Sequence, residues 1–397
     1  MINTLRKILF FFFLSFQLIV LAQAKLQVGA AQTEKYIFLL KDKKVGMVVN
    51  QTSTINHTHL VDSLIDLKID VQGIFSPEHG FRGNADAGEH VKSGVDQRTG
   101  VTIHSLYGNN KKPSSKQLSG INYMIFDIQD VGVRFYTYIS TLHYIMEACA
   151  ENNIPLLILD RPNPNGDYVA GPILDTVNYR SFVGMHPIPI VHGLTIGELA
   201  KMINGEQWLT KQQKCSLKII PCVGYTHKTK YDLPIKPSPN LGSYNAIRLY
   251  PSLCLFEPTI VSVGRGTIQP FEVVGVPTKY EHKNLPYTFT PKSIPGMSKY
   301  PKYENNLCYG YEVAKTYPEM LNRFDPTLFM EIKKITGLNE SDFVTSKSFL
   351  LKLVGNKTYY NYLMLGVTSS NDYAKFDQHL IRYKRMRKKY LLYPDFE

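Results

Sequence analysis

Apolar runs alternate with amphipathic stretches through the first half of the chain. The apolar runs, which predict buried strands, are residues 44–50, 69–75, 101–107, 123–128 and 155–160. The stretches with a helical period lie between and before them, at residues 36–40, 60–67 and 134–152. Such alternation is typical of βαβ units, so we predict an α/β fold with a mostly parallel sheet covered on both faces.

Polar turns follow four of these predicted strands. The turns are 51-QTS-53, 76-SPEHGFRG-83, 129-QDVGVR-134 and 161-RPNP-164, the last two coming soon after Asp127 and Asp160. In parallel sheets, ligands bind beyond the carboxyl ends of the strands. We therefore expect these turns to converge on one edge and to form a binding site there.

The second half begins after a proline-rich segment, 234-PIKPSPN-240, which breaks the periodicity. Before it, residues 195–204 predict a helix in which Thr195 and Glu198 form a capping box, and residues 216–221 predict a strand. After it, strand and helix signals are mixed, with helices expected at residues 326–335 and 376–390. A chain of 397 residues suggests about two domains. We predict one over residues 25–240 and a smaller α/β domain over residues 241–397.

The N-terminus has the pattern of a cleaved export signal. Arg6 and Lys7 precede an apolar run at residues 8–21, and the small-residue site 22-AQA-24 follows. The alternative is a membrane anchor, but the run is short for a ~20-residue span and Gln17 interrupts it. We predict a signal peptide over residues 1–24, export to the periplasm or the exterior, and no membrane span after cleavage.

Composition and net charge indicate which classes of molecule this protein could bind. The 44% hydrophobic and 20% charged residues are typical of a soluble globular protein, and five widely spaced cysteines predict no disulfide framework. The net charge of +12 would attract an anionic wall polymer, lipid or nucleic acid. Much of this charge lies at residues 382–389, where the pattern favours a helix with a basic, solvated face. No nucleic-acid-binding module is recognisable, so we expect no nucleic-acid partner.

Metal and nucleophile signatures are missing from the sequence. It contains no H-E-x-x-H, P-loop, G-x-S-x-G or paired C-x-x-C motif. His79 and His90 flank Asp86 and Glu89, which permits a metal site, but the spacing matches no standard pattern. We therefore predict no metal and no cofactor.

Carboxylates and aromatic rings are the better candidates for chemistry. Several acids, among them Glu78 and Asp127, lie in or beside the strand-end turns, and glycoside cleavage uses a pair of such groups. The alternative is that these acids cap helices and pair with arginines. Phe135, Tyr136 and Tyr138 could stack on a sugar ring, although packing in the core explains Phe135 and Tyr138 equally simply.

The segment 264-GRGTIQPFE-272 is the densest candidate in the second half. Gly264 and Gly266 allow close approach of the backbone to a ligand, and the planar Arg265 suits a carboxylate. The alternative is a glycine-rich hairpin in which Arg265 pairs with Glu272.

These segments together resemble the NamZ-type exo-β-N-acetylmuramidases. The motifs that carry the resemblance are SPEHGFRG, AGEHV, SLYG, FDIQDVGVRFYTYISTL, LDRPNP, PSPN, GRGT-x-x-PFE and the terminal KKYLLYP. The resemblance implies a Rossmann-like domain that binds no dinucleotide, a smaller C-terminal domain, and an active cleft between them. It also implies removal of N-acetylmuramic acid from the non-reducing ends of peptidoglycan fragments, with muropeptides or MurNAc-GlcNAc as substrates.

The resemblance also implies roles for individual residues. The expected catalytic residues are Glu78, as general acid, with Asp127 and Tyr136. The expected substrate-binding residues are His79, Arg82, Glu89, Gln129, Asp130, Arg134, Arg161, Asn163, His192, Arg265 and Glu272. Arg265 is expected to bind the lactyl carboxylate. The second catalytic group is either another carboxylate or the N-acetyl group of the substrate.

The sequence departs from the family pattern at two places. It has F-E-P-T at residues 256–259, where other members often have F-E-G-T, and Val263 where some carry glutamate. Two other functions therefore stay open: a non-catalytic muropeptide-binding protein on the same scaffold, and a different wall hydrolase such as an amidase or esterase.

Overall fold

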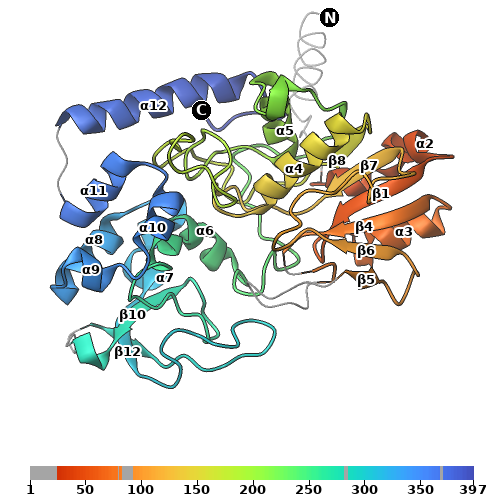
Figure 1. The fold of residues 1–397 in the computed structure, drawn as a ribbon. Helices are drawn as coiled ribbons and strands as arrows, with labels where there is room; N and C mark the ends of the chain where they lie inside the picture. Colours follow the sequence, from red (N-terminus) through yellow and green to blue (C-terminus); the bar gives the residue numbers. More distant parts are fainter. Residues whose placement is uncertain (1–24, 79, 83–92, 281–284, 367–369) are drawn as a thin grey trace, which may run out of the picture.

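The computed structural model describes residues 25–78, 80–82, 93–280, 285–366 and 370–397 (Figure 1). The expected signal peptide, residues 1–24, lies outside this range. Among the helices in these ranges, none is long and apolar enough to cross a membrane.

The first domain is built on a seven-stranded sheet within the described residues. The strands, in spatial order, are β5 (Gly94–Val95), β6 (Thr102–Ser105), β4 (Asp70–Ser76), β1 (Lys44–Val49), β7 (Tyr123–Asp127), β8 (Leu156–Leu159) and β9 (Leu217–Ile220). All neighbouring pairs are parallel except β5 with β6. The predicted mostly parallel sheet is confirmed. A short hairpin, β2 (Thr54–Ile55) with β3 (Thr58–His59), follows β1.

Helices cover both faces of this sheet, because the buried strands carry apolar side chains on both sides. Val48 and Phe126 belong to the core under α4 (Tyr138–Glu151) and α5 (Ile196–Gly205). The alternate residues Met47 and Ile125 belong to a second core under α3 (Leu60–Asp66). The short α2 (Ile37–Leu40) packs into that second core through Leu40. This two-faced burial is what continuous apolar runs predict.

The four polar turns do come together at one edge. Their strands β4, β1, β7 and β8 are consecutive and parallel, so their carboxyl ends point the same way. The turns after β1 and β7 are joined directly, because the Gln129 N–H donates to Thr52 Oγ1 at 3.0 Å. The edge is therefore a continuous polar layer.

Helix α4 begins later than the pattern at residues 134–152 predicts. It starts at Tyr138, so Arg134, Phe135 and Tyr136 lie in an irregular turn. The Arg134 N–H is bonded to the Ile190 carbonyl at 2.8 Å, which draws this backbone away from the helix. In α5, by contrast, the predicted capping box of Thr195 and Glu198 is confirmed.

The second domain combines a small antiparallel sheet with a group of short helices. Its strands are β10 (Val273–Pro277), β11 (Tyr287–Phe289) and β12 (Cys308–Glu312), with β12 in the middle. Its helices are α6 (Tyr244–Leu253), α7 (Val313–Thr316), α8 (Thr327–Thr336), α9 (Glu340–Phe343), α10 (Lys347–Val354) and α11 (Lys357–Leu365). It is an α/β unit, as predicted.

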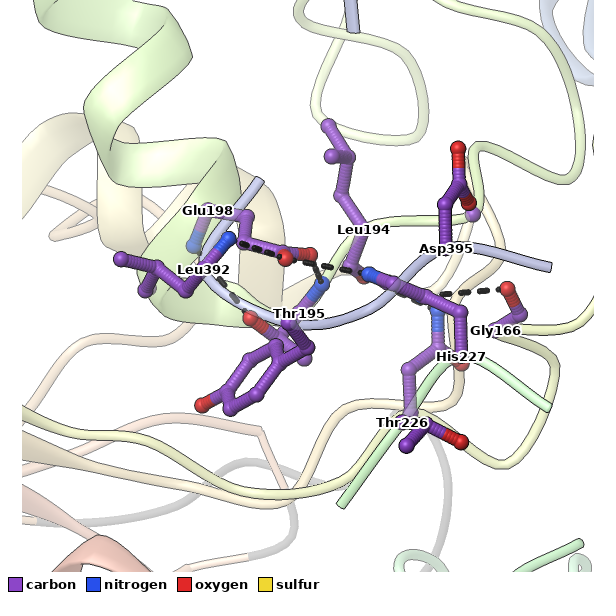
Figure 2. Close-up of polar contacts among 12 residues, drawn as sticks. Gly166, Leu194, Thr195, Glu198, Thr226, His227, Leu392 and Asp395 are labelled. Carbon is purple, nitrogen blue, oxygen red and sulfur yellow. Dashed lines mark hydrogen bonds and ion pairs between the residues drawn. The ribbon is translucent and has the colours of Figure 1, made fainter. Parts of the chain in front are cut away.

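The C-terminal helix α12 (Ser370–Lys388) leads back to the first domain (Figure 1). Arg387 donates from Nε to the Gly193 carbonyl at 2.8 Å. Beyond the helix, the Leu392 N–H donates to Glu198 Oε1 at 2.8 Å, and the same oxygen lies 3.0 Å from His227 Nε2 (Figure 2). Both Glu198 and His227 are fully buried. This buried pair ties the C-terminal tail to α5, so the end of the chain belongs structurally to the first domain.

Candidate active site between the two domains

A cavity of about 160 Å³ lies where the strand-end turns of the first domain face the second domain. The first-domain side is formed by Glu78, Phe135, Tyr136, Thr137 and Tyr138. The opposite side is formed by Tyr250, Glu257, Arg265, Phe271 and Phe349. The cavity thus combines one carboxylate next to a strand end, an arginine–glutamate pair and a lining of aromatic rings.

Glu78 enters this cavity from the turn directly after β4. Its Oε2 accepts a hydrogen bond from Thr137 Oγ1 at 3.1 Å, and the residue is half-buried. Gly80 follows with φ +81°, a conformation that favours glycine and turns the chain sharply. The strand end and this turn therefore place one carboxyl group at the cavity, with one of its oxygens bonded to Thr137.

The aromatic lining is rigid because its rings pack edge to face and its hydroxyl groups are bonded. The Tyr136 and Tyr138 ring centroids are 4.9 Å apart, and those of Tyr250 and Phe271 are 5.1 Å apart. Tyr136 donates its hydroxyl hydrogen to the Pro237 carbonyl at 2.8 Å. Burial raises the pKa of Tyr136 well above its ordinary value, so the phenol stays neutral. Tyr136 therefore shapes the wall rather than carrying charge.

Arg265 and Glu257 form a two-point ion pair in the cavity wall. The distances are 2.8 Å from Nε to Oε1 and 3.2 Å from Nη2 to Oε2. Burial alone would lower the pKa of Arg265, but the Glu257 carboxylate outweighs it and raises the pKa, so the guanidinium stays charged. Glu257 occupies one edge of the planar group, and the Arg265 side chain is 27% exposed. The edge that carries Nη1 is turned away from Glu257 and can receive an anion.

The backbone around Arg265 adopts conformations that fix this arginine. Gly264 and Gly266 have φ values of +75° and +82°, and a Cβ at Gly266 would lie 2.6 Å from Pro301. Phe271 has φ +59°, a strained value for a bulky residue, and its ring lies 5.0 Å from the Arg265 guanidinium carbon. Strained backbone of this kind concentrates at functional sites.

The proline-rich segment before residue 241 is part of the site, not only a linker. The Pro237 carbonyl accepts hydrogen bonds from Tyr136 Oη and, at 3.2 Å, from Gln51 Nε2 of the turn after β1. These bonds hold the segment against the first domain. It then places Ser238 and Asn240 in the cavity wall.

Asp127 and Arg161 are expected in the cleft, but the structure corrects this. Asp127 is fully buried at the end of β7, and Arg161 donates to both of its oxygens, at 2.5 Å from Nε and 2.9 Å from Nη2. Both residues stand outside the cavity lining. They join the turns after β7 and β8, because a buried carboxylate must be paired.

Arg134 is also buried instead of facing a ligand. Nη1 donates to the carbonyls of Pro172 and Ile188, and Nη2 donates to those of Leu353 and Val354, all between 2.7 and 2.9 Å. Burial lowers the pKa of Arg134 to about 9. With two carbonyls from each domain, this side chain joins the domains behind the cavity.

Four more of the expected binding residues are buried: Gln129, Asp130, Asn163 and His192. Gln129 Nε2 donates to the Pro162 carbonyl at 2.7 Å, and Asn163 Nδ2 donates to the Leu194 carbonyl at 2.9 Å. Burial raises the pKa of Asp130 to about 7, and burial lowers the pKa of His192 to about 3. The structure places all four outside the cavity lining, where they support the strand-end turns.

The remaining expected residues lie elsewhere. Arg82 makes two bonds to Asp96, at 3.1 and 2.9 Å, and does not line the cavity. Glu272 accepts from Ser243 Oγ at 2.6 Å, so the alternative Arg265–Glu272 pair is wrong. His79 and Glu89 lie outside the described residues. The cavity therefore retains Glu78, Tyr136 and Arg265 from the predicted set.

Comparison with known proteins decides the family. Two family models match: exo-β-N-acetylmuramidase NamZ, N-terminal, over residues 45–245, and exo-β-N-acetylmuramidase NamZ, C-terminal, over residues 248–393. The chain belongs to the NamZ family. This membership confirms the expected family and the enzyme class, a glycoside hydrolase of the exo-β-N-acetylmuramidase type.

Individual relatives agree over nearly the whole chain. The peptidoglycan β-N-acetylmuramidase NamZ of Bacillus subtilis (strain 168) is 37% identical over 372 residues, which are 89% of this chain and 88% of that protein. A crystal structure of a DUF1343 family protein from Bacteroides fragilis NCTC 9343 has a TM-score of 0.84 and 43% identity, covering 94% of this chain and 100% of that one. A second DUF1343 protein from the same strain has a TM-score of 0.76 and 26% identity, covering 93% and 99%.

Sequence patterns did not identify several of the residues that line this NamZ cavity. They are Thr137, Ser238, Asn240, Tyr250, Glu257 and Phe271. Two signals were available: the PSPN motif contains Ser238 and Asn240, and the F-E-P-T segment contains Glu257. The PSPN motif carries the family resemblance and lies at the predicted domain boundary, whereas F-E-P-T is a departure from the family pattern, so neither pattern by itself predicts a site residue.

Proposed function

We propose that this protein is an exo-acting glycoside hydrolase that releases N-acetylmuramic acid from the non-reducing ends of peptidoglycan fragments, with Glu78 as general acid. The supporting observation is that a carboxyl and a charged arginine, Glu78 and Arg265, line one small aromatic cavity between the domains. N-acetylmuramic acid offers a matching pair of groups, a glycosidic oxygen to protonate and a lactyl carboxylate to bind.

In this proposal, Glu78 donates a proton to the glycosidic oxygen as the bond to the anomeric carbon breaks. Water then supplies the hydroxyl group of the released sugar, and its remaining proton restores the Glu78 carboxyl. The proposal requires Glu78 to carry its proton when the substrate binds. Thr137 Oγ1 bonds Glu78 Oε2 and would leave Oε1 to carry the transferred proton.

Arg265 supplies the recognition of the lactyl group. Glu257 holds the Nε edge of the guanidinium, and the remaining edge binds the carboxylate of the substrate. Because Arg265 engages both Glu257 oxygens, Glu257 acts in this proposal by orienting the arginine and not as a nucleophile.

Product analysis of a MurNAc-GlcNAc digest tests the proposal. Followed by NMR, the wild type should release free N-acetylmuramic acid and N-acetylglucosamine, and longer fragments should lose sugar only from the non-reducing end. Binding of the disaccharide without turnover would instead favour a non-catalytic muropeptide-binding protein. Release of peptide or acetate, with intact glycan, would favour an amidase or esterase.

The predicted leader supports the proposal that the protein is exported to the periplasm or secreted. A wall-derived substrate would be met there, and the basic mature chain suits an anionic partner. N-terminal sequencing of the protein purified from its native host tests this. A mature start at Lys25 is expected, and a retained Met1 would contradict export by cleavage.

A further inference from the structure

Phe349 is the most exposed of the residues that line the cavity. It is 37% exposed, whereas the other lining residues are all buried or half-buried. The aromatic residues Tyr136, Tyr138 and Phe271 are only 7%, 1% and 1% exposed. A lining residue with high exposure lies where a cavity opens to solvent. Phe349 therefore lies at the mouth of the cavity, and these three rings lie deeper.

The Phe349 ring has an apolar face that the protein itself does not cover. No described aromatic ring or cationic group stacks on it, in contrast to Tyr250 and Phe271, which pack edge to face deeper in the wall. A single exposed apolar side chain on an open surface is ordinary and needs no explanation. In the lining of a ligand cavity, the same side chain offers a surface on which an apolar part of the ligand can pack.

Helix α10 turns Phe349 toward the cavity and fixes it there. Leu353, four residues later and therefore on the same face of the helix, also lines the cavity. The Leu353 carbonyl accepts a hydrogen bond from Arg134 Nη2 of the first domain at 2.7 Å. Leu350, beside Phe349, is fully buried in the core. The backbone that carries the exposed ring is thus held by both domains.

The start of α10 is also bonded to the segment that carries the arginine–glutamate pair. The Pro258 carbonyl accepts a hydrogen bond from the Ser346 N–H at 3.3 Å, and Ser346 lies three positions before Phe349. Pro258 directly follows Glu257, which holds Arg265. One connected part of the second domain therefore supports both the guanidinium in the cavity wall and the ring at the mouth.

We propose that the Phe349 ring packs on the second sugar of the substrate, the N-acetylglucosamine that becomes the leaving group. This inference rests on the proposed function, because an exo-acting enzyme holds the terminal sugar inside its cavity and leaves the next sugar at the mouth. The ring substituents of β-N-acetylglucosamine are all equatorial, so each face of the sugar presents only C–H bonds. Packing such a face on Phe349 removes two apolar surfaces from water.

A thio-linked disaccharide tests this contact without turnover. In thio-linked MurNAc-GlcNAc, sulfur replaces the glycosidic oxygen, so the ligand stays intact whichever residue acts as general acid. Calorimetric titration of the wild type should show this disaccharide binding about tenfold more tightly than N-acetylmuramic acid, because only the disaccharide covers the exposed ring.

The Phe349→Ala variant should lose this preference and should bind N-acetylmuramic acid with wild-type affinity, to within about twofold. Phe349→Trp keeps an aromatic face and should keep the preference, which a change in folding would not explain. Phe38→Ala is the matched control. Phe38 is 65% exposed on α2, outside the cavity lining, so its removal should leave both affinities unchanged.

The outcomes separate this inference from the proposed function. Equal binding of the two ligands by the wild type, or a preference that survives in Phe349→Ala, would overturn the role of Phe349 alone. An equal loss of affinity for both ligands in Phe349→Ala would overturn it too, since the ring would then act on the terminal sugar or on the fold. If the wild type binds neither ligand, the proposed function falls and the inference falls with it.

Discussion

Arg265 is held by Glu257 through two parallel hydrogen bonds, at 2.8 and 3.2 Å, in the wall of a cavity between the domains. The two residues are eight positions apart, on separate segments of irregular backbone. Lys302 supports the pair from behind, since its Nζ donates to the Glu257 carbonyl at 3.3 Å and to the Val261 carbonyl at 3.1 Å. The guanidinium is therefore a fixed binding group rather than a mobile surface charge.

Replacement of Arg265 by alanine should weaken N-acetylmuramic acid binding about 10- to 100-fold, the usual worth of a charge-assisted pair. N-acetylglucosamine, which lacks the lactyl carboxylate, should lose less than about threefold. Calorimetric titration of both sugars measures the difference. If both weaken by the same factor, Arg265 does not recognise the carboxylate. Arg265→Lys should recover only part of the affinity, because an ammonium cannot bond Glu257 and a ligand in one plane.

The Glu78→Gln variant should lose about 10²- to 10⁴-fold in kcat on an aryl β-N-acetylmuraminide that needs protonation of its leaving group. Binding of N-acetylmuramic acid should change little, since glutamine has the same shape. Initial rates and equilibrium titration separate the two effects. Glu304→Gln, at an exposed position, is the matched control and should retain wild-type turnover. Wild-type rates in the Glu78 variant would remove this residue from the mechanism.

Asp130 should make the protein less stable as pH rises between about 4 and 7. Burial raises its folded pKa to about 7, whereas an unfolded aspartate titrates near 3.9. In that interval the unfolded chain releases the proton and the folded chain keeps it, so the free energy of unfolding falls with pH. The full loss, present above pH 7, amounts to up to about 4 kcal/mol.

Asp130→Asn removes this titration and can keep the bond that Asp130 Oδ2 accepts from Gly132 N–H. Denaturant unfolding at pH 5 and pH 8 measures the free energy of unfolding of both proteins. The free energy of unfolding of the variant, relative to that of the wild type, should be higher at pH 8 than at pH 5. Asp66→Asn, at an exposed position, should show no such gain. A constant difference between variant and wild type at both pH values would mean that Asp130 does not hold its proton in the folded state.

Arg134→Met should destabilise the fold by at least about 3 kcal/mol, because it removes the guanidinium that donates to four carbonyls, of which that of Ile188 keeps the Leu174 N–H. Two of these carbonyls belong to each domain, so the variant should also loosen the contact between domains. Thermal unfolding and limited proteolysis measure both effects. Arg385→Met is the control, since that residue is exposed, and it should cost less than about 0.5 kcal/mol. An unchanged Arg134→Met melting temperature would contradict the joining role.

Six strands of the seven-stranded sheet and the helices packed on it follow from local pattern, whereas the strands of the second domain do not. The predicted strands at residues 44–50, 69–75 and 123–128 agree with β1, β4 and β7 to within one residue at each end, because two-sided burial demands continuous apolar runs. The start of α4 was wrong, because the Arg134 N–H is bonded to a carbonyl 56 positions along the chain. No local pattern records a bond of that kind.

The site residues also fall into two groups, those that local sequence predicts and those that only tertiary packing decides. Local sequence placed Glu78 at the site edge, because it lies in a polar turn directly after a strand, and the family resemblance then selected it as the general acid. Asp127 and Arg161 follow strands too, yet they face each other rather than the cavity. Strand ends bring candidate groups to one edge, and the packing of the turns then decides which of them bond each other and which meet a ligand.

The sequence by itself determined the parallel sheet, the edge that carries the polar turns, the place of Glu78 and the family, because these depend on local periodicity and contiguous motifs. Only the tertiary structure decided that Asp127 pairs with Arg161, that Glu257 pairs with Arg265 and that Arg134 joins the domains. These pairings depend on how the turns and the second domain pack, because burial forces each charged group to find a partner that no local pattern specifies.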